Sequence, residues 1–284
     1  MSLHHLLELT LTRRSLLCPV FLLFTALHTG SYSQDQAVTG SHEILMAIFA
    51  HPDDESVIAP LLAKYARQQV EVYLVFATGG GKGLREHAGI PMGEPLARAR
   101  MNEARCAARH LGVRDPIFLG LEDGSLGDSQ QFTQLHHLLD SLLDRNRPTA
   151  VITWDPGGYY GHIDHRMISN VVTELYQEKD YLSNSRLFYF GVPSWNREIT
   201  DTLRTISAKA LVNATLSTRR SLFTHQITWS VQDLEAARAA LSCHQSQFTP
   251  AEMKDLFFLN TAENVIHLRS AFTTGQARSS IWKD

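Results

Sequence analysis

The sequence predicts an α/β protein: a single domain with a Rossmann-like, mostly parallel sheet and helices on both of its faces. From residue 44 onward, short apolar runs alternate with segments in which apolar residues recur at helical spacing. Strands that alternate with helices of this length are typical of a parallel sheet covered on both faces. The chain of 284 residues is long enough to bury one good core, and its sequence contains no internal repeat or low-complexity linker.

The elements can be placed in order along the chain. Strands are expected at the apolar runs 44–50, 70–77, 116–119, 150–153 and 265–268. Helices are expected where the apolar spacing is helical, at 57–68, 96–111, 132–143, 167–176 and 234–241. Gly112 ends the second helix, a usual place for glycine. Residues 193–224 are rich in Ser, Thr and Arg without a clean period, and we expect loops or an insertion beside the site.

The N-terminus predicts export. A pair of arginines precedes an apolar run at 15–27, and small and polar residues follow it. This run is too short for a membrane span, which needs roughly 20 apolar residues, but it suits the core of a signal peptide. We therefore expect a signal peptide at 1–33, a short linker at 34–43 and one domain at 44–284, in a periplasmic or extracellular protein. An amphipathic or membrane-anchoring helix is the alternative.

The net charge and the number of cysteines exclude some classes of protein. The formal net charge is −3, and no basic stripe of the kind that marks a nucleic-acid surface is present. Cys106 and Cys243 are the cysteines left after the N-terminal segment. Two thiols cannot build a disulfide framework, so the fold depends on its core. They could pair with each other in an oxidising compartment or be buried as small hydrophobic side chains, and we favour the second interpretation.

Two short motifs carry the chemistry. The segment Ala-His-Pro-Asp-Asp-Glu, which contains His51 and Asp54, directly follows the first apolar run. The segment Gly-His-Ile-Asp-His-Arg, which contains His162 and His165, comes more than a hundred residues later, after another predicted strand. Each motif places two potential metal ligands three residues apart. Ligand sites of α/β proteins lie just beyond the carboxyl ends of their strands.

Together the motifs predict a hydrolytic metal site. Catalytic zinc takes three protein ligands and keeps a fourth position for water, although Fe²⁺, Co²⁺ and Mn²⁺ accept similar nitrogen and oxygen donors. Such an ion lowers the pKa of its water from about 15.7 to about 7. Asp53, next to a ligand, could accept the proton and pass one to the leaving group. An acidic first turn favoured by the helix dipole is the plainer interpretation of Asp53 and Asp54, but it leaves the second motif unexplained.

A glycine-rich segment at 78–83 follows the second predicted strand. It lacks the complete Gly-X-Gly-X-X-Gly pattern that opens directly into a helix in dinucleotide-binding proteins. We therefore expect it to form a flexible wall of the active site and not a cofactor site.

The two motifs resemble those of the PIG-L/LmbE-like zinc-dependent N-acetylglucosaminyl deacetylases. Weaker similarities continue along most of the chain after the N-terminal segment, including His-Gln-Ser-Gln at 244–247. The resemblance implies a Rossmann-like sheet and a zinc ion held by His51, Asp54 and His165. It implies that Asp53 is the general base that activates water.

The resemblance also implies roles for four further residues. His162 would be the protonated group that stabilises the oxyanion, with Asp164 setting its charge. Tyr160 would help to polarise the carbonyl, and Arg100 would reach the substrate. Two positions depart from the family pattern: a glycine replaces a common glutamate after the second strand, and Ile163 replaces a common proline.

The expected function is therefore a metal-dependent amidase that removes acetyl from an N-acetylated amino sugar, either a small molecule or an oligosaccharide. One alternative is a secreted carbohydrate-binding protein that retains the metal site as a relic. Another is a metal phosphoesterase, which would more naturally carry extra carboxylates for two ions. Export would favour an extracytoplasmic glycan or glycoconjugate as substrate. The sequence carries no signal for the oligomeric state.

Overall fold

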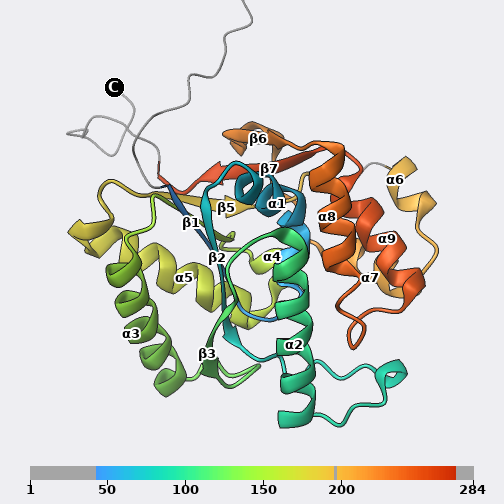
Figure 1. Ribbon diagram of the computed structural model, residues 1–284, viewed down its shortest axis with the longest axis horizontal. Coiled ribbons are helices and arrows are strands. Elements are labelled where there is room, and N and C mark those ends of the chain that lie inside the picture. Colours follow the sequence, from blue (N-terminus) through green and yellow to red (C-terminus); the bar gives the residue numbers. More distant parts are fainter. Residues whose placement is uncertain (1–42, 195–196, 273–284) are drawn as a thin grey trace, which may run out of the picture. The chain divides into compact units, whose positions relative to one another are not determined.

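The computed structural model describes residues 43–194 and 197–272 (Figure 1), so the predicted signal peptide at 1–33 lies outside the described residues. A seven-stranded sheet has the order β3-β2-β1-β4-β5-β7-β6. The strands are β1 (Ile44–Phe49), β2 (Glu71–Thr78), β3 (Ile117–Leu121), β4 (Ala150–Trp154), β5 (Arg186–Phe190), β6 (His225–Thr228) and β7 (Val265–Ser270). The first five strands are parallel, whereas β7 runs antiparallel to both β5 and β6. The prediction of a Rossmann-like, mostly parallel sheet is confirmed.

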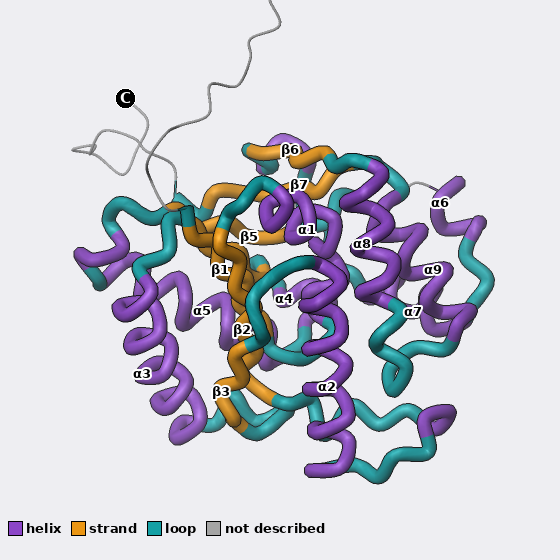
Figure 2. The backbone as a smooth tube through the Cα atoms, viewed as in Figure 1, coloured by secondary structure: helices purple, strands orange, loops and turns teal. Residues whose placement is uncertain are grey.

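The strands are flanked by helices, as the tube in Figure 2 shows. The α-helices are α1 (Ala59–Arg67), α2 (Glu94–Leu111), α3 (Ser129–Asn146), α4 (Gly158–Gly161), α5 (Ile163–Glu178), α6 (Arg197–Thr202), α7 (Ile206–Ala214), α8 (Val231–Leu241) and α9 (Pro250–Thr261). Short 3₁₀ helices are η1 (Asp54–Ile58), η2 (Glu86–Ala88), η3 (Asp180–Leu182) and η4 (Arg220–Leu222). In the part of the chain that the structure describes, no helix is both long and apolar enough to cross a membrane.

The central strand β1 shows why its run is continuously apolar. Successive side chains of a strand point to opposite faces, and here both faces are covered. Leu45, Ala47 and Phe49 pack into a core that includes residues of α1, α2 and α8. The intervening residues of β1, together with Ala50, pack with α3 and α5 on the other face. A strand buried on both faces loses the alternation of apolar and polar residues.

The strand order places the site. Both β2 and β4 pair with β1, so the chain leaves β1 on one side and returns on the other. The carboxyl ends of β1 and β4 therefore meet at the point where strand order reverses, which is where open α/β sheets bind ligands. Both histidine motifs follow these two strands.

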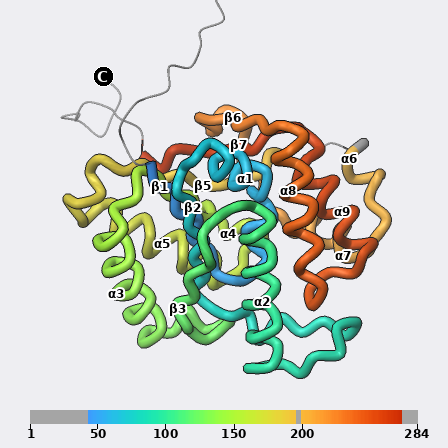
Figure 3. The backbone as a smooth tube through the Cα atoms, viewed as in Figure 1, coloured from blue at the N-terminus to red at the C-terminus, as the bar shows by residue number. Residues whose placement is uncertain are grey.

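Two sequence predictions need correction. Residues 193–224 contain the helices α6 and α7 in addition to loops, and α7 packs beside α9 (Figure 3). Cys106 on α2 and Cys243, just beyond α8, form a disulfide with their Cα atoms 5.9 Å apart. The interpretation of the cysteines as separate buried hydrophobic side chains is therefore wrong. The structure also contains β5, β6 and α9, which the sequence analysis did not predict.

Candidate metal centre and active site

Three side chains from the two motifs converge at the carboxyl ends of β1 and β4. His51 and Asp54 follow β1, and His165 lies in the first turn of α5 after β4. His51 Nδ1 lies 3.3 Å from His165 Nε2 and 3.7 Å from Asp54 Oδ2. His165 Nε2 lies 3.4 Å from Asp54 Oδ1. Ligand atoms bound to one tetrahedral zinc ion lie roughly 3.3 Å from one another, so the spacing of these three donors fits such an ion.

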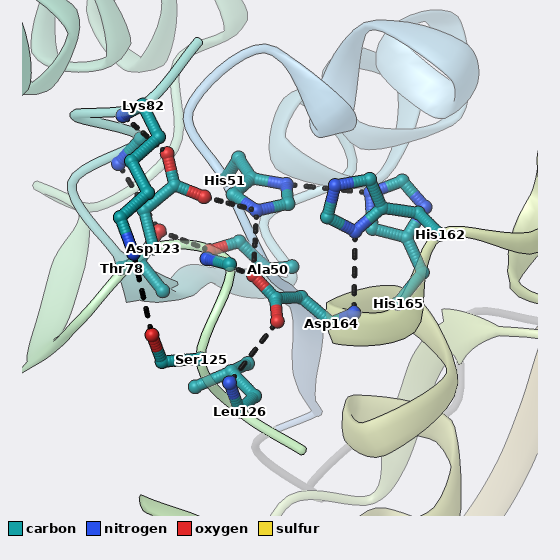
Figure 4. A network of polar contacts seen from close by, with 12 residues as sticks. Ala50, His51, Thr78, Lys82, Asp123, Ser125, Leu126, His162, Asp164 and His165 are labelled. Atoms are coloured by element: carbon teal, nitrogen blue, oxygen red, sulfur yellow. Dashed lines mark hydrogen bonds and ion pairs between the residues drawn. The ribbon is translucent and has the colours of Figure 1, made fainter. Parts of the chain in front are cut away.

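The opposite nitrogen of each histidine fixes the tautomer that a metal requires. His51 Nε2 faces two carboxylates, Asp123 Oδ1 at 3.1 Å and Asp164 Oδ2 at 3.2 Å, as Figure 4 shows. His165 Nδ1 lies 3.3 Å from the carbonyl oxygen of Gly158. These acceptors place a proton on the outer nitrogen and leave the inner lone pair free. With the protons on the outer nitrogens, the inner lone pairs of His51 and His165 face the same point as the Asp54 carboxylate, so the donor set fits a metal ion.

Asp54 is held as a charged ligand. Its Oδ2 accepts hydrogen bonds from the backbone N–H groups of Ala50 at 3.1 Å and His51 at 3.0 Å, and from the indole of Trp154 at 3.3 Å. Burial raises the pKa of Asp54, but the neighbouring His165 and His51 hold that pKa well below its ordinary value. The carboxylate is therefore ionised and oriented before any metal binds.

Asp53 occupies a strained position beside the ligands. Its φ of 102° lies in the left-handed region, which non-glycine residues seldom adopt and which concentrates at functional sites. Its N–H donates to Glu55 Oε2 at 2.9 Å, and Glu55 Oε1 lies 2.6 Å from Nε2 of the buried His244. Burial raises the pKa of Asp53 to about 6, although Arg100 opposes the rise. A carboxylate with such a pKa suits general base and acid work near neutral pH.

Arg100 contacts Asp53 and the backbone. The side chain is 4% exposed, and its Nη2 lies 2.9 Å from Asp53 Oδ1 and 2.5 Å from the carbonyl oxygen of Pro52. Its Nη1 donates to the carbonyl oxygen of Gly80 at 2.8 Å. A Cβ at Gly80 would lie 2.2 Å from Nη1, and Gly80 has a φ of +69°. The glycine-rich segment 78–83 thus encloses Arg100, and substrate contact by Arg100 stays a prediction.

His162 and Asp164 make contacts that the sequence did not reveal, and their roles in catalysis stay predictions. His162 caps the N-terminus of α5, where its Nδ1 accepts a hydrogen bond from the N–H of Asp164 at 3.2 Å. Burial and the nearby His51 and His165 lower the pKa of His162. While Nδ1 accepts this hydrogen bond, the ring proton is on Nε2; the oxyanion role of His162 stays a prediction.

The carboxylate of Asp164 turns away from His162 and toward His51. Asp164 is fully buried, and its oxygens accept hydrogen bonds from the N–H groups of Gly124 at 2.7 Å and Leu126 at 3.1 Å. This arrangement joins the loop after β3 to the start of α5. The direct effect of Asp164 is on the orientation and tautomer of His51.

A cavity of 480 Å³ opens beside Asp53 and Asp54. Tyr160, which is 39% exposed, lines this cavity together with Trp154 and Tyr159. The Tyr160 ring lies 5.3 Å from the ring of His165 and 5.9 Å from that of His162. Within the described residues, the segment 78–83 does not line this cavity, but it contacts the site through Arg100 and Asp123; its role as a wall of the active site stays a prediction.

Residues 46–176 match the family model PIG-L: GlcNAc-PI de-N-acetylase. The 1D-myo-inositol 2-acetamido-2-deoxy-alpha-D-glucopyranoside deacetylase of Mycobacteroides abscessus is 33% identical over 160 residues, covering 48% of this chain and 56% of that protein. The protein of the same name from Mycobacterium bovis is 31% identical over 146 residues, covering 43% and 46%. The chain thus spans about half the length of these curated relatives.

Solved structures share the fold of this chain. The N,N'-diacetylchitobiose deacetylase of Pyrococcus horikoshii has a TM-score of 0.55 at 20% identity, covering 80% of this chain and 82% of its own. A deacetylase in teicoplanin biosynthesis has a TM-score of 0.59 at 14% identity, with 80% and 97% covered. The 4-carboxy-2-hydroxymuconate hydratase of Pseudomonas putida KT2440 has a TM-score of 0.56 at 16% sequence identity, covering 84% of this chain and 100% of its own. At these identities the likeness shows the fold alone, which serves more than one reaction.

Sequence reasoning missed several residues that support the candidate site. Asp123 contacts His51. Burial raises the pKa of Asp123, but the hydrogen bond and charge of His51, the Lys82 N–H and Arg100 together lower it to about 2. The Trp154 ring stacks on His165 with centroids 4.5 Å apart. The buried pair of Glu55 and His244 supports Asp53, because Glu55 accepts a hydrogen bond from the Asp53 N–H. The position of Asp123 and Trp154 at the ends of strands was the signal that could have marked them.

Proposed function

We propose that this protein is a metal-dependent deacetylase that hydrolyses the acetamide of an N-acetylated amino sugar. The observation that carries the proposal is the set of three donor atoms at tetrahedral spacing, with both histidine tautomers fixed from outside, next to Asp53. The match of residues 46–176 to the model PIG-L: GlcNAc-PI de-N-acetylase and the names of the curated relatives support the same reaction class. The solved structures support the fold.

His51, Asp54 and His165 would hold the ion. Their nitrogen and oxygen donors suit Zn²⁺, and Fe²⁺, Co²⁺ or Mn²⁺ could take its place. When bound, the ion supplies a Lewis acid and an acidified water at neutral pH. Asp123 and Asp164 keep His51 oriented and are occupied by that task and by backbone N–H groups. His51, Asp123 and Asp164 are close enough together to hold an ion of their own, but the two carboxylates already accept backbone N–H groups of Lys82, Gly124 and Leu126, which favours a single ion.

Asp53 moves the proton in the proposed reaction. Its carboxylate accepts a proton from the attacking water as the oxygen–carbon bond forms. It then donates that proton to the amine nitrogen as the carbon–nitrogen bond breaks, which yields acetate and a free amino sugar. Arg100 holds Asp53 in place through the 2.9 Å contact and is a positioning residue in this scheme.

His162 and Tyr160 would act on the carbonyl oxygen. A neutral His162 presents its Nε2–H, and Tyr160 offers a hydroxyl at the cavity wall. Fixed donors directed at the oxygen that becomes negative are worth most in a site that excludes water. These roles need no charge on His162, which agrees with the lowered pKa of its ring.

The disulfide supports the export expected from the N-terminal sequence. Disulfides persist in oxidising compartments and are rare in the cytosol, and Cys106 is bonded to Cys243. We therefore place the proposed deacetylase outside the cytoplasm, where an acetylated glycan or glycoconjugate would be its substrate.

Metal analysis and acetate release test the proposal together. The purified protein should bind one zinc ion and release acetate from N-acetylglucosamine or its conjugates in a chelator-sensitive manner. Asp53→Asn should retain zinc and lose most turnover, whereas His165→Ala should lose zinc. Zinc binding without acetate release from any acetylated sugar would contradict the deacetylase and favour the binding-protein alternative. Absence of zinc binding would contradict the metal centre itself.

A further inference from the structure

Resting on the proposed function, we propose that the cavity beside Asp53 selects amino sugars that carry an apolar aglycone, which α7 and α9 hold. The amine side of the scissile amide must face Asp53, because Asp53 protonates the departing amine. Asp53 also lines the cavity. The part of the substrate that extends into the cavity is therefore the amino sugar and whatever is attached to it.

Regular faces of two helices build the far wall. The lining residues of α7 are Ser207, Ala208, Ala210, Leu211 and Ala214. Residues three, four and seven positions apart share one side of a helix, so these side chains form a continuous and mostly apolar strip. The lining residues of α9 are Glu252, Leu256 and Asn260, which are spaced by four. The cavity volume of 480 Å³ lies within the range of about 300–1,000 Å³ found for ligand pockets.

The wall is fixed in place by contacts between the two helices. Asp255 Oδ2 on α9 accepts hydrogen bonds from the backbone N–H groups of Arg204 at 3.0 Å and Thr205 at 2.7 Å. It also accepts one from the Thr205 hydroxyl at 2.7 Å. At the other end of α7, the N–H of Leu216 donates to the carbonyl oxygen of Tyr159 at 2.7 Å. The strip on α7 is thus tied to α9 and to the turn that carries the active-site tyrosines.

The polar groups on this wall already have protein partners. Glu252 Oε1 accepts from Arg85 at 2.6 Å and from Ser207 at 2.6 Å. Asn260 Nδ2 donates to the carbonyl oxygen of Ser56 at 3.1 Å. A polyhydroxylated aglycone such as a second sugar would have to break these bonds or leave its own hydroxyls unpaired, which costs free energy. An apolar aglycone needs no such partners and gains from burial against the strip.

Substrate comparison tests this selection. Acetate release is measured from N-acetylglucosamine, N,N'-diacetylchitobiose and 4-nitrophenyl N-acetyl-β-glucosaminide. We expect kcat/KM for the nitrophenyl glycoside to exceed that of the other two by at least tenfold. Leu211→Asn should reduce this preference about tenfold. Ile206→Asn is the matched control, because Ile206 is on the same helix, is 88% exposed and does not line the cavity; it should leave the preference intact.

Three results would overturn the inference. The first is a wild-type preference for the nitrophenyl glycoside below twofold, and the second is an equal effect of the two asparagine variants on that preference. The third is faster hydrolysis of N-octanoyl than of N-acetyl glucosamine, which would place an acyl chain in the cavity. Calorimetric binding of the same sugars to the zinc-loaded Asp53→Asn variant separates this inference from the proposed function. If no substrate releases acetate, the deacetylase proposal fails. In that case, tighter binding of the nitrophenyl glycoside than of the other sugars would still support the apolar subsite, and equal binding would overturn the subsite.

Discussion

Removal of the Cys106–Cys243 disulfide should destabilise the protein without disabling its site. The bond joins α2 to the segment after α8 and closes a loop across 137 positions of sequence. Cross-linking acts mainly by restricting the unfolded chain, and the chain-entropy relation gives about 5 kcal/mol for a loop of this length. Removing native disulfides typically costs 2–5 kcal/mol, so this value is the upper end of the expected loss in unfolding free energy.

The folded position of the neighbouring loop does not depend on the disulfide alone. His244, next to Cys243, lies 2.6 Å from Glu55. The hydroxyl and N–H of Ser246 donate to Glu103 on α2 at 2.6 and 2.7 Å. After the disulfide is broken, these contacts still hold the loop against α2 and against Glu55, the residue next to the candidate metal ligand Asp54. We therefore expect the temperature midpoint to fall by about 10 °C, while kcat at 25 °C changes less than twofold.

Thermal unfolding with and without a phosphine reductant measures this effect, and alkylation followed by mass spectrometry confirms that the thiols are free. The control is Cys106→Ala combined with Cys243→Ala, which should match the reduced wild type and be insensitive to reductant. Equal midpoints for oxidised, reduced and doubly substituted proteins would refute the entropy argument. A large loss of kcat at 25 °C with folding intact would refute the claim that the remaining contacts hold the loop.

Three further predictions concern the metal centre. In the metal-free protein, NMR titration should give Asp53 a pKa of about 6. Arg100→Met should raise this pKa, because the guanidinium stabilises the carboxylate. An unchanged pKa in the variant would show that Arg100 is not a positioning residue for Asp53. Zinc added to the wild type should lower the same pKa, since a nearby cation favours the ionised form, and an unaffected Asp53 would place the ion elsewhere. Asp164→Asn should weaken zinc binding by about tenfold in a competition with a chelator. The control Glu122→Gln, in the neighbouring loop, should leave zinc affinity unchanged. Equal zinc affinities of the two variants would show that Asp164 does not orient His51.

The convergence of the candidate metal ligands could be predicted from sequence because a parallel sheet collects the carboxyl ends of its strands. His51 and Asp54 are separated from His165 by more than a hundred residues, yet β1 and β4 are neighbours in the sheet. The three-residue spacing within each motif then brings the side chains to one point. Asp123 and Trp154 occupy equivalent places after β3 and at the end of β4, but a single residue without a spaced partner gives no comparable signal.

The wall of the cavity and the cysteine pairing could not be predicted for a different reason. The helix α7 is short, and its first turn is fixed by Thr205 and by Asp255 from α9. Its position therefore depends on a tertiary contact across about 50 residues more than on its own apolar period. Likewise, whether Cys106 meets Cys243 depends on how the ends of α2 and α8 pack, which neither cysteine reveals.

Asp164 shows most clearly how the fold changes the meaning of a motif. The resemblance implied that Asp164 sets the charge of His162. In the structure, the first turn of α5 directs the backbone N–H of Asp164 to His162 and its carboxylate to His51. That carboxylate instead joins Gly124, in the loop after β3, to His51 after β1. Because His51 then presents Nδ1 inward, the second motif prepares the ligand of the first as well as supplying its own. The metal centre is thus a property of three strand ends held together, and neither motif would form it alone.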